Sequence, residues 1–128
     1  RGVAKVYALL AAGGGLGGAR LLAPGTAELL QRPGELATDR VFGFEARWAL
    51  GFQHQPWSDE ATGKRLGHTF GLGGIGGSVA FGCRSAAGAV GFAYLTRQMG
   101  DWARGERVQD ALAAVLGFQH RPWSDEAT

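Results

Sequence analysis

The sequence contains a single cysteine, Cys83, and it has neither a long apolar run nor a run of basic residues. One cysteine cannot form an internal disulfide, which favours a reducing compartment and leads us to expect a cytoplasmic location. No apolar run approaches the roughly 20 residues of a membrane-spanning helix, so no membrane partner is expected. The net charge is +2 and the basic residues are scattered, so we expect no nucleic acid partner either.

Histidine and cysteine, the usual ligands of zinc, are also scarce. The three histidines are His54, His68 and His120, and they form no H-x-x-x-H motif and have no cysteine pair beside them. We therefore expect no metal site and interpret His54 as a histidine of a loop or an edge strand. Cys83, between a glycine and an arginine in an apolar segment, is interpreted as a small core residue and not as a nucleophile.

Glycine, in contrast, is abundant, with 23 of 128 residues. Gly71, Gly73 and Gly76 match the G-x-G-x-x-G spacing of dinucleotide-binding loops, and the segment GGGLGG at 13–18 matches it again. Such a loop needs a strand before it, a helix after it and an acidic residue about 20 positions further on. Strand-like residues follow Gly76, and Thr96 and Arg97 occupy the acidic position, so no nucleotide cofactor is expected.

Helical and turn signals alternate in the first third of the chain. Val3, Val6, Tyr7 and Leu10 have the spacing of an amphipathic helix, which the glycines from position 13 end. The segment GGGLGGARLL is then expected to form a turn with a short extended pair. A second, short helix is predicted from Pro24, ending at the Pro-Gly pair at 33–34.

From position 41 onward the sequence is aromatic and extended. FGFEARWALGFQH (42–54) predicts one strand or two short ones ending before Pro56, and PWSDEATGKR (56–65) predicts a polar loop. GSVAFGCRS (77–85) and GAVGFAYLTR (88–97) predict a hairpin that turns near Ser85–Gly88. One face of this hairpin is large and apolar, whereas the other is small enough to admit a helix; the small residues are Ala80, Gly82, Gly91 and Ala93.

A last helix is expected after Asp101, a favourable N-cap. Its buried side is predicted to consist of Val108, Leu112, Val115 and Leu116. Helices at both ends of at least three antiparallel strands indicate an α+β fold.

The chain also repeats itself. LGFQHQPWSDEAT at 50–62 returns as LGFQHRPWSDEAT at 116–128, with Gln55 replaced by Arg121. A recent duplication, a truncated array or an artefact would give this repeat no function. Alternatively, the two copies compete for one strand position, within one chain or in a domain-swapped oligomer through 50–62 and 116–128.

Three blocks, taken together, resemble a known family. They are RGVAKVYALLAAGGG at the start, LLAPGT at 21–26 and FGLGGIGGS at 70–78. Their order and spacing resemble the C-terminal part of the β-lactamase-related serine hydrolases, which include class C β-lactamases, penicillin-binding-protein-like enzymes and β-lactamase-fold carboxylesterases. The resemblance implies that 1–116 is the C-terminal segment of a β-lactamase/transpeptidase-like domain, incomplete here, followed by a tail at 117–128 that repeats 51–62.

The resemblance also implies where a site would lie. The family uses a Ser-x-x-Lys nucleophile motif, a second motif with Tyr or Ser, and a third, His-x-Gly or Lys-Thr-Gly, on a strand beside the acyl carbonyl. Aligning FGLGGIGGS on the third motif puts Leu72, Gly73 and Gly74 at its positions, with the backbone N–H of Ile75 toward the oxyanion. Leu72 stands where the family has His or Lys, and His68 could replace it only in a different register.

No Ser-x-x-Lys occurs in the sequence. We therefore expect a fragment of a hydrolase that would cleave a small ester, lactone or amide through an acyl-serine once joined to a missing N-terminal half. Alone, it is predicted to be inactive. The alternative is a non-catalytic pseudoenzyme or interaction module on the same scaffold.

Overall fold

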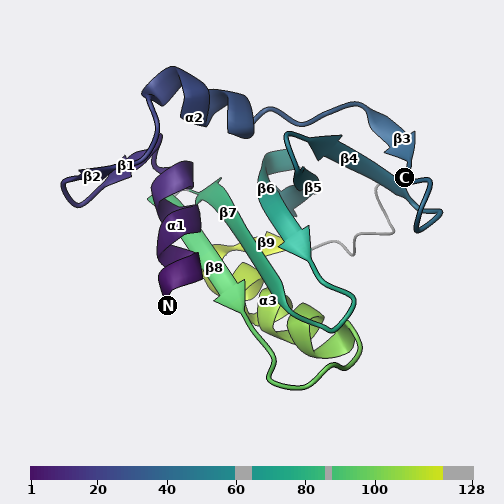
Figure 1. Cartoon of the computed structure of the whole chain (residues 1–128). Helices are drawn as coiled ribbons and strands as arrows, with labels where there is room; N and C mark the ends of the chain where they lie inside the picture. Colours follow the sequence, from purple (N-terminus) through teal and green to yellow (C-terminus); the bar gives the residue numbers. More distant parts are fainter. Residues whose placement is uncertain (60–64, 86–87, 120–128) are drawn as a thin grey trace.

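The computed structural model of the chain describes residues 1–59, 65–85 and 88–119, and an antiparallel sheet dominates it (Figure 1). The sheet has the order β3-β4-β5-β6-β7-β8, and β9 pairs with β5. Its strands are β3 (Leu36–Thr38), β4 (Glu45–Ala49), β5 (Phe52–Asp59), β6 (Arg65–Gly73), β7 (Val79–Ser85), β8 (Gly88–Tyr94) and β9 (Phe118–Gln119). The helices are α1 (Gly2–Ala11), α2 (Pro24–Leu30) and α3 (Ala103–Leu116). The α+β prediction is confirmed.

Helix α1 lies against β7 and β8, on the face that the sequence marks as small (Figure 1). A Cβ on Gly91 would overlap the carbonyl oxygen of Ala4, and one on Gly82 would come within 2.9 Å of the carbonyl oxygen of Tyr7. The prediction of a helix against this face is therefore confirmed. The buried side of α1 was only partly predicted, because Val3 and Val6 are 40% and 46% exposed. A helix that lies this close to a sheet makes its contact through its small residues, and bulky valines fit better outside it.

The segments after α1 form as expected. β1 (Gly15–Leu16) and β2 (Ala19–Arg20) make the short extended pair, joined through Gly17 and Gly18 with positive φ. Helix α2 begins at Pro24 and ends at Leu30, before the Pro-Gly pair. Pro24 fits the first turn because its missing N–H has no partner within a helix there.

The aromatic segment forms two strands, but the second is longer than predicted. β4 and β5 are joined by Leu50 and Gly51, and β5 then continues through Pro56 to Asp59. The loop predicted over 56–65 is therefore wrong for 56–59, which belong to β5, and for Arg65, which begins β6, and 60–64 lie outside the described residues. Pro56 faces His68 in β6 and lies between the parts of β5 that pair with β4 and with β9, where a residue without an N–H is tolerated.

Helix α3 covers the opposite face of the sheet. The N-cap of α3 is Trp102, which makes no side-chain capping bond, so the prediction of Asp101 as the N-cap is wrong by one residue. The Asp101 carboxylate instead accepts the N–H of Ala103, the first helical residue, at 3.1 Å. Leu112 and Leu116 pack against the core as predicted, but Val108 and Val115 are 36% and 83% exposed, so that part of the prediction is wrong. The residues of α3 that are buried are Gly105, Gln109 and Ala113. They recur every four residues, and their small or flexible side chains let the helix approach β7 closely.

The sheet thus separates two apolar clusters. The cluster between α3 and the sheet consists of Trp57, Val79, Phe81, Cys83 and Ala113. The cluster between α1 and the sheet consists of Leu10, Ala11 and Phe70. Among the described residues, no helix is long and apolar enough to cross a membrane. The division of the chain at residue 116 stays a prediction, and residues 120–128 of the tail lie outside the described residues.

Candidate functional site

The segment aligned with the third motif lies at the end of β6 and in the turn that follows. Leu72 faces Ala80 and Gly73 faces Val79 across β6 and β7. The chain then turns, with the N–H of Gly74 donating to the carbonyl of Ser78 at 2.7 Å. The structure therefore holds Leu72, Gly73, Gly74 and Ile75 together at one exposed strand end, where Leu72 and Ile75 are 47% and 66% exposed.

Three glycines in and beside this segment, Gly71, Gly73 and Gly77, are required by atoms of the chain itself. A Cβ on Gly73 would come within 2.7 Å of the Trp102 ring, and one on Gly71 within 2.5 Å of Phe81 Cβ. Gly77 has φ +94, and a Cβ there would overlap the carbonyl oxygen of Asp101. Close packing of β7 and of the start of α3 is thus sufficient to explain these glycines, without a ligand.

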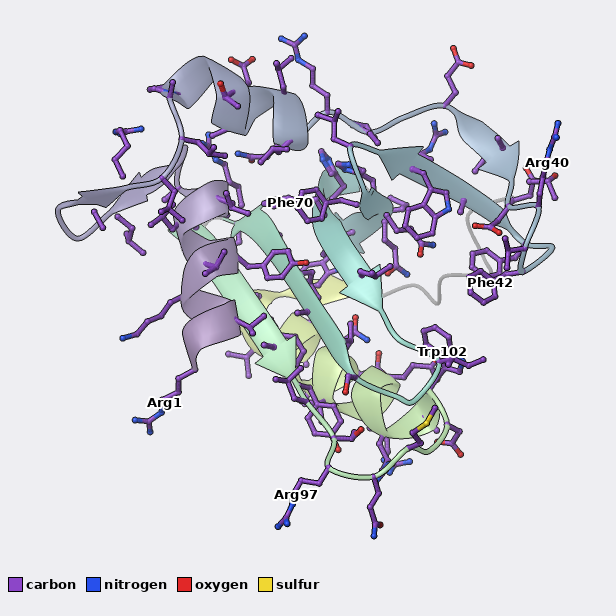
Figure 2. The ribbon with its side chains drawn as sticks, in the orientation of Figure 1. Arg1, Arg40, Phe42, Phe70, Arg97 and Trp102 are labelled. Carbon is purple, nitrogen blue, oxygen red and sulfur yellow. The ribbon has the colours of Figure 1, made fainter. Side chains whose placement is uncertain are left out.

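Aromatic side chains surround this strand end. A small depression of about 40 Å³ lies at this strand end. On one side it is lined by Leu72, Gly73 and Ile75. The other lining residues are four aromatic side chains and one amide, those of Phe42, Phe44, Trp48, Trp102 and Gln53. Figure 2 shows Phe42 and Trp102 on the same side of the molecule. About 40 Å³ is little more than one water molecule occupies in the liquid, so the depression as it stands is too small for a substrate.

The loop that carries Phe42 is held by a carboxylate. Asp39 Oδ1 accepts the N–H groups of Val41 and Phe42 at 2.8 and 2.9 Å. These backbone hydrogen bonds, that from Phe42 first, lower the pKa of Asp39. Phe42 and Phe44 stack, with ring centroids 5.7 Å apart and an interplanar angle of 17°.

One of the residues that line the depression is polar. Gln53 is 4% exposed, and its Nε2 has no hydrogen-bond partner among the described residues. A buried amide donor without a partner is costly, and an oxygen acceptor beside it would satisfy it. The strand end therefore combines aromatic rings, exposed aliphatic side chains and one unused donor.

The structure does not bring His68 to Leu72. His68 lies four residues earlier in β6, about 13 Å along the strand, and its Nε2 contacts the carbonyl oxygen of Gln31 at 2.6 Å. Its ring is 5.2 Å from that of His54.

His54 differs from its interpretation as a loop or edge histidine. It is 1% exposed, because β5 is an inner strand that lies between β4 and β6 at this position. Neither ring nitrogen has a hydrogen-bond partner in the described part of the chain. Burial, with a smaller contribution from His68, lowers the pKa of His54 to about 4.

The other reactive side chains belong to the core. Cys83 is 2% exposed, and burial raises its pKa to about 12, which confirms its interpretation as a core residue. Burial also raises the pKa of Tyr7, which packs between Phe52 and Phe70. In the described ranges, no three His, Cys, Asp or Glu side chains gather where they could hold a metal ion.

A larger hollow lies away from the strand end. It measures about 710 Å³ and is lined by residues of the segment after β8 and by Arg104 of α3. Arg104 donates to the carbonyl of Gln98 at 3.2 Å, and Arg97 points away from the molecule (Figure 2). The lining of this hollow is polar and open to solvent, and it includes none of the third-motif positions.

Sequence reasoning missed the aromatic rings around Leu72. Trp102 and Phe42 are 60 positions apart, and the loop and helix that carry them meet only in the folded chain. The one sequence signal is that a Trp directly follows Asp101, where the last helix was predicted to begin.

No protein-family model and no curated protein matches this chain. Its fold, however, is that of part of a β-lactamase-type hydrolase domain. The solved structure that shows this is a family VIII carboxylesterase, with 35% sequence identity and a TM-score of 0.63. The match covers 79% of this chain and 26% of the carboxylesterase, so the chain spans about a quarter of that enzyme. The resemblance to part of a β-lactamase-related serine hydrolase is therefore confirmed.

Proposed function

We propose that this chain is the C-terminal part of a serine hydrolase that cleaves small esters, lactones or amides through an acyl-serine. In that hydrolase it supplies the third-motif strand. The observation that carries the proposal is the exposed end of β6, where Leu72–Ile75 lie beside aromatic rings on a scaffold 35% identical to a carboxylesterase.

Alone, the chain is inactive in this proposal, because it lacks the nucleophile. None of Ser58, Ser78, Ser85 and Ser124 is followed by lysine three residues later. Ser78, the serine nearest to the motif in sequence, accepts the N–H of Thr96 at 3.1 Å and so holds β7 to the segment after β8. Leu72 can neither donate a proton nor hold a charge where the family has His or Lys.

The proposed partner is the rest of the hydrolase domain. The small volume beside Leu72 supports this, because a polypeptide placed over the aromatic rings would deepen the depression into a pocket of ordinary size. The substrate would be a small ester or amide whose apolar part contacts these rings.

A colorimetric assay tests the inactivity. The purified chain is incubated with p-nitrophenyl acetate and with a chromogenic β-lactam, and we expect no turnover above the buffer rate. Turnover that a serine-directed phosphonate abolishes would contradict the proposal, since it would require a nucleophile in this chain.

The alternative is a pseudoenzyme or interaction module on the same scaffold, and Leu72 favours it, because leucine removes chemistry from the part that is present. The coding sequence upstream of Arg1 separates the two. A Ser-x-x-Lys there supports the hydrolase, whereas a related domain without it supports the pseudoenzyme.

A further inference from the structure

Strand β8 forms one end of the sheet, and its outer edge is open to a further strand. Its residues, GAVGFAY, pair with β7 without a shift of register, and in the described part of the chain no strand pairs with its other side. Sheet edges are usually protected by short strands, charged side chains, proline or bulges. β3, at the other end of the sheet, has only 3 residues, whereas β8 has 7 and shows none of these features. Such an edge is an acceptor for another extended segment.

The direction of the backbone groups of β8 follows from the hydrogen bonds of β7. The N–H of Gly74 donates to the carbonyl of Ser78 at 2.7 Å, so the backbone groups of Ser78 and of the even-numbered residues after it face β6. The odd-numbered residues of β7 then face β8, where their partners are even-numbered. Ala89, Gly91 and Ala93 therefore point their N–H and C=O groups away from β7. Among the described residues, these groups have no hydrogen-bond partner.

The side chains of β8 differ between the two faces of the sheet. On one face, the backbone of α1 lies directly over Gly91, where a Cβ would overlap the carbonyl oxygen of Ala4 and the nitrogen of Ala8. On the face of α3, Val90 and Phe92 pack against the core but are only half-buried. A strand added outside β8 would bury more of these two side chains, most favourably with apolar residues beside them.

A second copy of the chain does not fit this edge over its whole length. Pairing β8 with its own copy centres on Gly91 and places the two Gly91 Cα atoms about 5.5 Å apart. The twofold axis of this pairing is perpendicular to the sheet, so both α1 helices would lie on the same face, each over its own Gly91. Packed helices need about 8–10 Å between their axes. The occupant must therefore be a strand that carries no helix on that face.

We propose that the outer edge of β8 accepts an extended segment of the remaining hydrolase domain, with apolar side chains beside Val90 and Phe92. The match covers 26% of the carboxylesterase, so most of such an enzyme lies outside this sequence and can supply that segment. The inference rests on the proposed function, from which it takes its partner, and adds through which atoms the two parts join.

Amide hydrogen exchange, resolved by residue in the full chain, tests this edge. The probe is a polypeptide that supplies the remaining part of a family VIII carboxylesterase. On its addition, Ala89, Gly91 and Ala93 should gain at least about tenfold more protection than Val90 and Phe92, whose N–H groups already bond to β7. This alternation is specific to strand addition, because contact with either face of the sheet would not separate odd from even residues.

A variant at the exposed end of β8 provides the matched test. Ala89→Pro removes an N–H that β7 does not use, so the free chain should keep its melting temperature. We expect this variant to bind the polypeptide about five- to tenfold more weakly, because one hydrogen bond is lost and the proline ring lies where the partner would pair. Ala89→Ser retains the N–H and should bind within about twofold of the wild type.

Four results would overturn the inference. A complex that forms, seen as a higher melting temperature, but leaves exchange at Ala89, Gly91 and Ala93 unchanged would place the contact elsewhere and leave the proposed function intact. Equal binding by Ala89→Pro and Ala89→Ser would likewise exclude pairing at this edge. The absence of any complex would remove the partner and count against the proposed function as well. Protection that rises with the concentration of the free chain alone would identify a second copy as the occupant.

Discussion

At the scale of single residues, Gly73 allows the Trp102 ring to pack against β6. Its missing side chain leaves room for the Trp102 ring, which a Cβ would approach to 2.7 Å. Gly74, next in the chain, meets nothing closer than the Ser78 carbonyl oxygen at 3.7 Å. The two positions look alike in sequence and differ in the space around them, so they form a matched pair.

We expect Gly73→Ala to lower the free energy of unfolding by about 1–3 kcal/mol, because the Trp102 ring must move. Gly74→Ala should change it by less than about 0.5 kcal/mol, as a substitution in open space does. Urea denaturation followed by tryptophan fluorescence measures both. Equal effects at the two positions would show that the Trp102 contact does not constrain the motif.

The lowered pKa of His54 should make the stability of the folded chain depend on pH. Its folded pKa is about 4, below the usual 6.5, because burial and then the charge of His68 disfavour the imidazolium. Between these values the unfolded chain binds a proton at this position and the folded chain does not. Acidification through this window therefore favours the unfolded state.

We expect the free energy of unfolding to fall by up to about 3 kcal/mol between pH 6.5 and pH 4 through His54. The comparison is denaturant unfolding of the wild type and His54→Phe across this range. The variant should lose most of the slope. Asp39, whose pKa lies below 3.8, acts at lower pH and does not obscure the result. Parallel pH profiles for the two proteins would assign the slope to other groups.

At the scale of elements, the turn between β4 and β5 has an unfavourable backbone conformation at Leu50. Leu50 and Gly51 both have positive φ, as a two-residue hairpin turn requires, and such turns favour Asn-Gly. Leu50 is also 67% exposed, so its side chain contributes little packing to offset the unfavourable backbone.

Leu50→Asn should therefore raise the free energy of unfolding by about 1 kcal/mol, since asparagine adopts this conformation at lower cost. Thermal denaturation would show a higher midpoint. Gly51→Ala is the opposite control and should lower the midpoint, because it places a Cβ at φ +83. A destabilising Leu50→Asn would mean that the leucine side chain supports the fold in another way.

The elements also show what the sequence could predict. The hairpin faces and the position of α1 followed from local pattern, because Gly82 and Gly91 leave space that only a close neighbour can fill. The extent of β5 did not, because Pro56 indicates a loop until its pairing with His68 of β6 is known. The structure keeps Leu72–Ile75 together at one strand end, whereas their role as a third motif stays a prediction. The aromatic residues beside them, Phe42 and Trp102, come from regions far apart in the chain, so local pattern could not predict them.

At the scale of the whole molecule, the chain presents apolar side chains on several surfaces. Val6, Leu16, Leu21, Ile75 and Met99 are each at least 46% exposed. Exposed apolar groups are ordinary when scattered, but a larger apolar surface usually marks an interface. These side chains are scattered, so the apolar surface on which we propose that the rest of the domain packs is the aromatic strand end with Leu72 and Ile75.

The last prediction concerns that assembly. When the chain is mixed with a polypeptide that supplies the remaining part of a family VIII carboxylesterase, including its Ser-x-x-Lys, we expect a complex with a higher melting temperature than the chain alone. The wild-type complex should hydrolyse p-nitrophenyl acetate weakly, because Leu72 supplies no proton donor.

Leu72→His should raise the rate of this complex by about 10²–10⁴-fold, the usual contribution of a positioned acid or base. Leu72→Ala is the matched control and should leave the rate low. The free chain with Leu72→His should remain inactive, since it still lacks a nucleophile. A stable complex in which Leu72→His gives no gain would mean that this strand end does not contribute to the chemistry, and the interaction module would then be the better description.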